Sequence, residues 1–75
     1  MSLHFEVHFV DGSYQEFPAK DSVAGEVVRL RRDGFKDREI VETVLGDDWG
    51  PPPQVVVLVG TLADGTRVRE SLGYK

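Results

Sequence analysis

Residues 54–62 (QVVVLVGTL) form the only run in this sequence in which apolar side chains fill both alternate sets of positions. β-branched residues favour the pleated backbone of a strand, and Pro51, Pro52 and Pro53 just before the run prevent a helix from continuing into it. A strand that is apolar on both faces is normally covered on both sides. The run therefore predicts the central strand of a sheet.

The N-terminal segment predicts a β-hairpin. Residues 3–9 (LHFEVHF) alternate apolar and polar side chains, an Asp-Gly pair at 11–12 supplies the positive φ of a tight turn, and residues 13–17 return as a second strand. The sequence leaves two registers open. A two-residue turn sets Phe9 opposite Tyr14, whereas a bulged three-residue turn sets Phe5 opposite Phe17.

Two helices and a second hairpin follow. Asp21 or Ser22 is expected to cap a helix that Gly34 ends, and Asp37 to cap a shorter helix that Gly46 ends. A second Asp-Gly turn follows the central strand and leads into a last strand. We predict an α+β fold with ββ-αα-ββ order, in which a four-stranded antiparallel sheet carries a helical hairpin on one face. One domain is expected over residues 1–75.

Composition limits the function classes. Nine Lys and Arg against 13 Asp and Glu give a net charge of −4, so the field of the whole molecule opposes nucleic acid and anionic lipid. The chain has no cysteine, which fits a reducing compartment. Residues 1–4 lack the features of a secretory signal, and no apolar run approaches the ~20 residues that span a bilayer. We expect a cytoplasmic protein without a membrane contact or a cofactor.

No motif indicates catalysis or a metal site. The acidic residues are explained by turns, helix caps and a solvated loop, so no catalytic residue is predicted. His4, Glu6 and His8 share one side of the first strand and are suitable zinc ligands. Because residues i and i+4 of a strand lie ~13 Å apart, the two histidines cannot reach one ion without a bend. We therefore predict no specific metal site there.

Arginines in the helical region suggest an alternative function. Arg29, Arg32 and Arg38 would form a nucleic-acid-binding surface if they shared one uninterrupted face, although neighbouring acids nearly neutralise the region. Residues 28–41 (VRLRRDGFKDREIV) resemble the first two helices of bacterial helix-turn-helix regulators. In those regulators a recognition helix follows and reads the bases. Here prolines and a strand follow, so the resemblance implies a helical hairpin and not DNA reading.

Protein binding is the predicted function, and a homodimer is its expected form. Two short helices cannot cover both faces of the sheet, so one apolar set of the central strand needs another cover. We assigned Val56 and Leu58 to that uncovered set; in a competing account the sheet curls so that they meet the Trp49 loop within one chain. Asp47, Asp48 and Trp49 in the proline-stiffened loop are further candidate contacts. Trp49 is either an interface anchor or a lid that packs on Phe35 or Val44. The sequence thus favours a small non-enzymatic accessory or regulatory protein.

Overall fold

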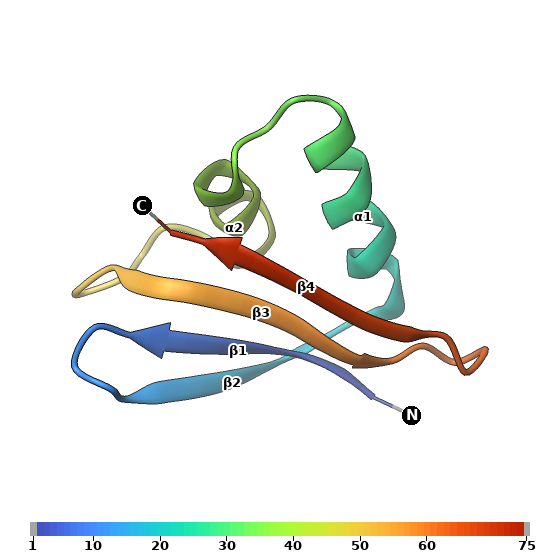
Figure 1. Ribbon diagram of the computed structural model, residues 1–75, viewed down its shortest axis with the longest axis horizontal. Coiled ribbons are helices and arrows are strands. Elements are labelled where there is room, and N and C mark those ends of the chain that lie inside the picture. The colour runs from blue at the N-terminus through green and yellow to red at the C-terminus, as the bar shows by residue number, and fades with distance from the viewer. Residues whose placement is uncertain (1, 75) are drawn as a thin grey trace.

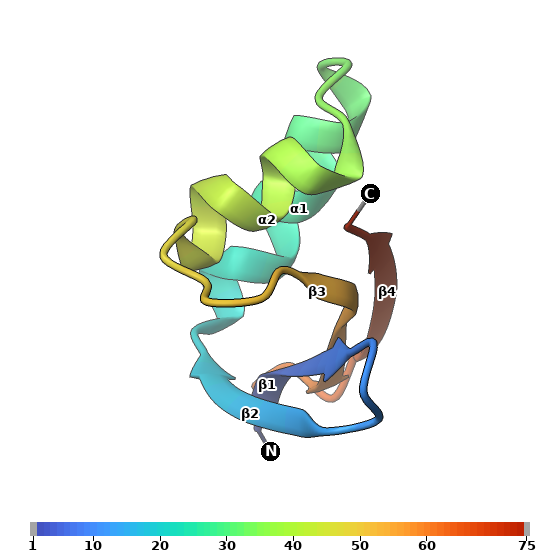
Figure 2. The ribbon, with the colours of Figure 1, turned by 90° about the vertical axis from the view of Figure 1, so that its left-hand side faces the viewer.

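The computed structural model describes residues 2–74, so positions 1 and 75 of the predicted single domain lie outside it. Four antiparallel strands form one sheet in the order β2-β1-β3-β4, and both helices lie on the same side of it (Figures 1 and 2). This arrangement confirms the predicted α+β fold and its ββ-αα-ββ order. The elements are β1 (Leu3–Phe9), β2 (Tyr14–Ala19), α1 (Asp21–Arg32), α2 (Asp37–Leu45), β3 (Pro53–Thr61) and β4 (Arg67–Gly73).

The strand expected at the centre of the sheet is β3, which pairs with β1 on one side and with β4 on the other. Val56 lies opposite Val7 and Leu58 lies opposite Phe5. Val56 and Leu58 are both 0% exposed. Because directly opposed residues of an antiparallel pair point to the same face, this set of β3 joins the inward row of β1.

The first hairpin adopts the longer of the two turns considered. Phe5 lies opposite Phe17, which confirms the bulged register. Gly12 has a φ of +91°, and the Phe9 N–H donates to the Ser13 carbonyl oxygen at 2.9 Å. The Asp11 carboxylate accepts hydrogen bonds from both the Ser13 hydroxyl and the Ser13 N–H. These bonds lower the pKa of Asp11, and the bond from the hydroxyl has the larger effect.

The core lies between the helices and the inner face of the sheet. The helices bury Val27, Leu30, Ile40 and Val41, while the sheet contributes apolar side chains from β1, β3 and β4. Burying one such side chain stabilises the fold by roughly 1.5–3 kcal/mol. Since the domain contains no disulfide, this packing is the main source of its stability.

The predicted helix caps are wrong, and the structure gives their aspartates another role. Lys20 and Lys36 occupy the N-cap positions, and neither Asp21 nor Asp37 caps its helix. The Asp21 carboxylate accepts from the Ala63 N–H at 2.8 Å, and the Asp37 carboxylate accepts from the Gly73 N–H at 3.2 Å. Both aspartates therefore tie the start of a helix to the second hairpin.

Arg31 fastens the end of α1 to strand β4. Its guanidinium contacts Glu70 at 2.6 Å and Asp37 at 3.4 Å, and it donates to the Ser71 carbonyl oxygen at 3.2 Å. Together with the bond from Gly73 to Asp37, these contacts occupy outward-pointing backbone groups of β4 near its C-terminal end. That end of the sheet edge is therefore covered by side chains.

Gly60 generates the first testable prediction. A Cβ at Gly60 would lie 2.1 Å from the Ser2 carbonyl oxygen, and the φ of +145° disfavours any other residue. We expect Gly60→Ala to lower the free energy of unfolding by at least ~2 kcal/mol, measured by urea denaturation. Gly73→Ala is the matched control in the neighbouring strand, because no atom lies within 4 Å of its Cβ position. Equal losses from the two variants would contradict this account.

Candidate functional site

The candidate site is the outer face of the sheet, which points away from the helices. Its position follows from the register, since the residues that alternate with the buried Leu3, Phe5 and Val7 must point to the other side. We call this surface the outer sheet face. It consists of His4, Glu6 and His8 from β1, Tyr14, Glu16 and Pro18 from β2, Val55, Val57 and Val59 from β3, and Arg67, Arg69 and Ser71 from β4.

The predicted partner contacts Val56 and Leu58 are not on this face, and this placement corrects the sequence-based expectation. Both side chains are fully buried in the core of a single chain. Instead, Val55, Val57 and Val59 form the set that faces away from the helices. Val57 is only 8% exposed, and Glu6 of β1 and Ser71 of β4 lie opposite it. The apolar strip on the outer face is therefore narrow and partly covered.

Charge is distributed unevenly across the outer sheet face. Glu6 and Glu16 lie opposite each other on β1 and β2, while Arg67 and Arg69 lie on β4 at the other side of the sheet. The valines of β3 separate the two groups. In addition, Glu6 lies 3.4 Å from the Nε2 atom of His4 and 3.6 Å from that of His8. The face thus has an acidic half, an apolar centre and a basic half.

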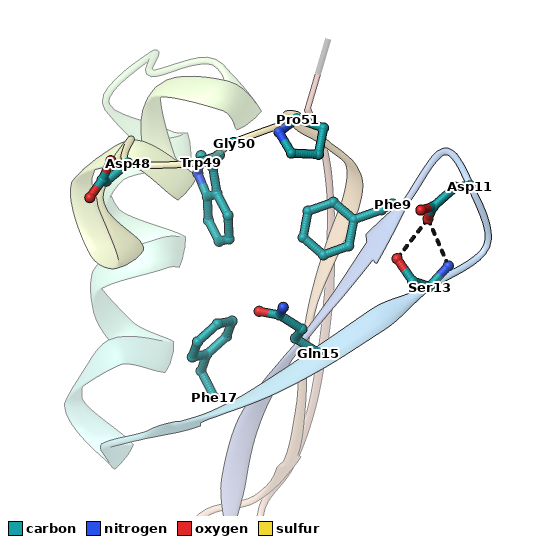
Figure 3. Close-up of a pocket in the computed structure, with 9 residues that line it drawn as sticks. All are labelled: Phe9, Asp11, Ser13, Gln15, Phe17, Asp48, Trp49, Gly50 and Pro51. Carbon is teal, nitrogen blue, oxygen red and sulfur yellow. Dashed lines mark hydrogen bonds between the residues drawn. The ribbon is translucent and has the colours of Figure 1, made fainter.

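The Trp49 loop folds back onto the sheet. Figure 3 shows the rings of Phe9, Phe17 and Trp49 around one cavity, with the Asp48 carboxylate turned away from it. The Trp49 ring packs edge-on against Phe9 and Phe17, with centroid separations of 6.2 and 6.3 Å. Sequence reasoning considered Phe35 and Val44 as packing partners and did not identify either of these rings. Asp47 and Asp48 are exposed, as a solvated loop requires.

The cavity beside Trp49 has a volume of about 370 Å³. Its wall combines aromatic rings with the amide of Gln15 and the carboxylate of Asp11 (Figure 3). The Trp49 Nε1 atom is buried and has no hydrogen-bond partner among residues 2–74. This arrangement makes Trp49 a lid over one end of the core, with partly buried rings packed against the central cluster.

The three arginines of the nucleic-acid alternative do not all line one groove. Arg29 and Arg32 line the same groove beside α1. Arg38 lies on α2, where its guanidinium contacts Glu42 at 3.3 Å and lies 5.0 Å from the centre of the Tyr74 ring. Arg38 is therefore paired outside the groove that Arg29 and Arg32 line.

The side chains that lie close enough together to share a metal ion are not the three considered in the sequence analysis. The ligand atoms of His4, Glu6 and Glu16 all lie within 4.8 Å of one another, because Glu16 stands opposite Glu6 in the hairpin. Sequence reasoning missed Glu16, which only the correct hairpin register identifies. Ligands of a tetrahedral zinc ion, at bonds of about 2.0–2.1 Å, lie roughly 3.3 Å apart. The 3.4 Å between His4 Nε2 and the Glu6 carboxylate already matches this spacing, whereas Glu16 lies exposed on the neighbouring strand.

Comparisons with known protein families, with curated proteins and with solved structures found no match to this chain. Within residues 2–74, neither helix is long and apolar enough to cross a membrane.

Trp49 gives a prediction about stability. We expect Trp49→Ala to lower the free energy of unfolding by about 2–4 kcal/mol, because the substitution removes the ring that packs on Phe9 and Phe17. Urea denaturation of the purified variant is the measurement. Asp48→Ala in the same loop is the control and should change stability by less than about 0.5 kcal/mol. An unchanged midpoint for Trp49→Ala would return the residue to the role of an exposed partner contact.

The metal expectation also remains testable. We expect no tight zinc site at His4, Glu6 and Glu16, because the group supplies three ligand side chains where a structural zinc site has four, and Glu16 is exposed to solvent. Calorimetric titration with zinc at neutral pH is the measurement. A one-to-one isotherm with sub-micromolar affinity that His4→Ala abolishes would contradict the prediction.

Proposed function

We propose that this protein acts by protein–protein binding and forms a homodimer through its outer sheet face. The observation that carries the proposal is the order of chemistry across the sheet, with acids on β1 and β2, valines on β3 and arginines on β4. A surface of this kind is complementary to itself. The absence of cysteine in the sequence is compatible with a reducing compartment, and we propose that binding takes place in the cytoplasm.

The charge order favours one dimer geometry. A two-fold axis that runs along β3, between two facing sheets, places β4 of one copy over β1 of the other. Glu6 then faces Ser71 of the partner subunit, two residues along β4 from the partner's Arg69, and the β3 valines face each other. A two-fold axis at right angles to the strands places acids over acids and arginines over arginines. Like charges oppose that arrangement.

The energetics favour a weak dimer. Val57 is only 8% exposed in the single chain, so the gain in burial comes mainly from Val55 and Val59. Each exposed ion pair contributes at most about 1 kcal/mol. A four-stranded face is small for an interface, and small interfaces are typical of transient complexes. We therefore propose reversible self-association that depends on concentration and salt.

A non-enzymatic role is part of the same proposal. The pKa of Asp11 is lowered first by the Ser13 hydroxyl, and the pKa of Asp64 is lowered first by the Thr66 N–H. A general acid at neutral pH requires a carboxyl group whose pKa is raised. The pKa values of Asp11 and Asp64 are both lowered, which is the opposite of what a general acid requires. Both residues lie in turns, which supports a structural role for them.

A charge exchange tests the dimer. In sedimentation equilibrium at about 100 μM, we expect the wild type to contain dimer, and Arg69→Glu and Glu6→Arg each to shift it to monomer. The double variant Arg69→Glu/Glu6→Arg should dimerise again, because it restores opposite charges with the halves exchanged.

Arg38→Glu is the control for net charge. It changes the charge of the chain as Arg69→Glu does, but it lies on α2, away from the outer sheet face. This variant should remain dimeric. A monomeric wild type, or a double variant that stays monomeric, would overturn the proposed dimer.

A further inference from the structure

A groove lies between α1 and the hairpin formed by β3 and β4, and it shares Arg67 and Arg69 with the outer sheet face. It has a volume of about 470 Å³ and is distinct from the Trp49 cavity. Figure 1 shows α1 above the first part of β4. We call this feature the α1–β4 groove.

The floor of the α1–β4 groove is apolar. Val28 of α1 lines it and is 51% exposed, although the helix buries Ala24 and Val27 beside it. Val68 of β4 is partly buried and completes the floor. Because Val28 is exposed and lies beside the partly buried Val68, an apolar side chain of a binding partner would gain burial by contacting both.

The rim of the groove is basic. Arg29 and Arg32 line it from α1, and Arg67 and Arg69 line it from β4. Within residues 2–74, Arg32, Arg67 and Arg69 have no carboxylate partner. The acidic residue that lines the groove is Glu70, and its carboxylate is bound by Arg31. The groove is therefore locally positive on a chain with a net charge of −4.

The edge of β4 is open where it borders the groove. The Ser71 carbonyl and the Gly73 N–H point outward from the sheet, and Arg31 and Asp37 bind them. Because backbone groups of a strand alternate in direction, those of Arg67 and Arg69 also point outward. Among the described residues, no side chain hydrogen-bonds these groups. This stretch can accept another strand.

We propose that the α1–β4 groove binds an acidic, extended segment of a partner protein, which adds to β4 as a fifth strand. Backbone hydrogen bonds form with the outward groups of Arg67 and Arg69. Alternate side chains of an added strand point to opposite faces. An apolar residue then meets Val28 and Val68 on the inner face, while acidic residues on the other face meet the guanidiniums of Arg67 and Arg69. Arg29 and Arg32 at the rim bind further carboxylates.

An acidic peptide fits this groove better than nucleic acid does. The net charge of −4 opposes the approach of a long polyanion, whereas a short acidic segment interacts mainly with the local arginines. A valine floor offers a phosphate backbone nothing to bind, but it suits the apolar side chain of a peptide. The combination of an open strand edge, an apolar floor and a basic rim selects a strand that alternates acidic and apolar residues.

A peptide titration tests the groove. The probe is a short, capped, fluorescent peptide of alternating Glu and Val, titrated with the full chain and followed by fluorescence anisotropy. We expect saturable binding that Arg29→Glu and Val28→Asp each weaken by about tenfold or more. A peptide of alternating Lys and Val should not bind, and methylation of the amide nitrogens on one edge of the acidic peptide should abolish binding.

Arg38→Glu is a closely matched control for Arg29→Glu. Each arginine has a side chain that is 54% exposed and pairs with an acid four residues later, at 3.4 Å for Arg29 and 3.3 Å for Arg38. The control lies outside the groove and should bind the peptide like the wild type. Circular dichroism of each variant establishes that the fold is retained.

Several outcomes would overturn the proposal. They are the absence of saturable binding, equal loss from Arg29→Glu and Arg38→Glu, and unchanged binding of the methylated peptide. A single-stranded oligonucleotide that binds more tightly than the acidic peptide, with loss on Arg29→Glu, would assign the groove to nucleic acid. Because Arg29 and Val28 lie outside the outer sheet face, the variants that test the groove leave Glu6 and Arg69, the residues of the dimer test, unchanged.

Discussion

The pairing of β1 with β3 is the contact on which the rest of the structure depends. Each hairpin is local in sequence, but the two hairpins meet only along these strands, which are separated by both helices. The pairing brings Phe5 and Val7 beside Leu58 and Val56 and so creates the inner face that the helices cover. It also brings Ser2 so close to Gly60 that no side chain fits there. The core, the position of the helices and the composition of the outer sheet face all follow from this one register.

That register also marks the limit of what the sequence could predict. The element order, the central position of residues 54–62 and the helical hairpin follow from local patterns, and the structure confirms them. The face to which each valine points cannot be predicted from local patterns. Both alternate sets of β3 are apolar, so period-two alternation alone does not show which set points inward. The polar row of His4, Glu6 and His8 decides the matter, since it stands opposite Val59, Val57 and Val55. Only the long-range pairing makes that connection.

Asp21 and Asp37 show a second limit of the same kind. Aspartate before an apolar helical stripe is typical of an N-cap, which is a local interaction. In the structure each residue lies one position inside the helix, where its charge still favours the positive end of the helix dipole, and its carboxylate reaches a backbone N–H of the second hairpin. The hydrogen-bonding groups that these carboxylates satisfy lie 42 and 36 residues away in sequence. A local pattern identifies the residue type but not so distant a partner.

The Trp49 loop is a similar case, because its contacts with Phe9 and Phe17 join segments that sequence spacing does not relate.

The two edges of the sheet are protected differently, so they differ in their capacity to pair with another strand. On β2, Pro18 lies opposite His4 and has no N–H to offer another strand. On β4, Arg31 binds the outward Ser71 carbonyl and Asp37 binds the outward Gly73 N–H. These two side chains bind no outward backbone group nearer the start of β4 among the described residues. Towards its start, β4 has arginines at both outward-facing positions instead of a covering side chain. Exposed cations on a strand edge discourage pairing between identical edges, since a second β4 would bring like charges together. The same arginines attract a strand of opposite charge. The edge that resists pairing with a second β4 is therefore the edge suited to the proposed acidic partner, whereas the proposed dimer uses the outer sheet face, where acids and arginines occur together.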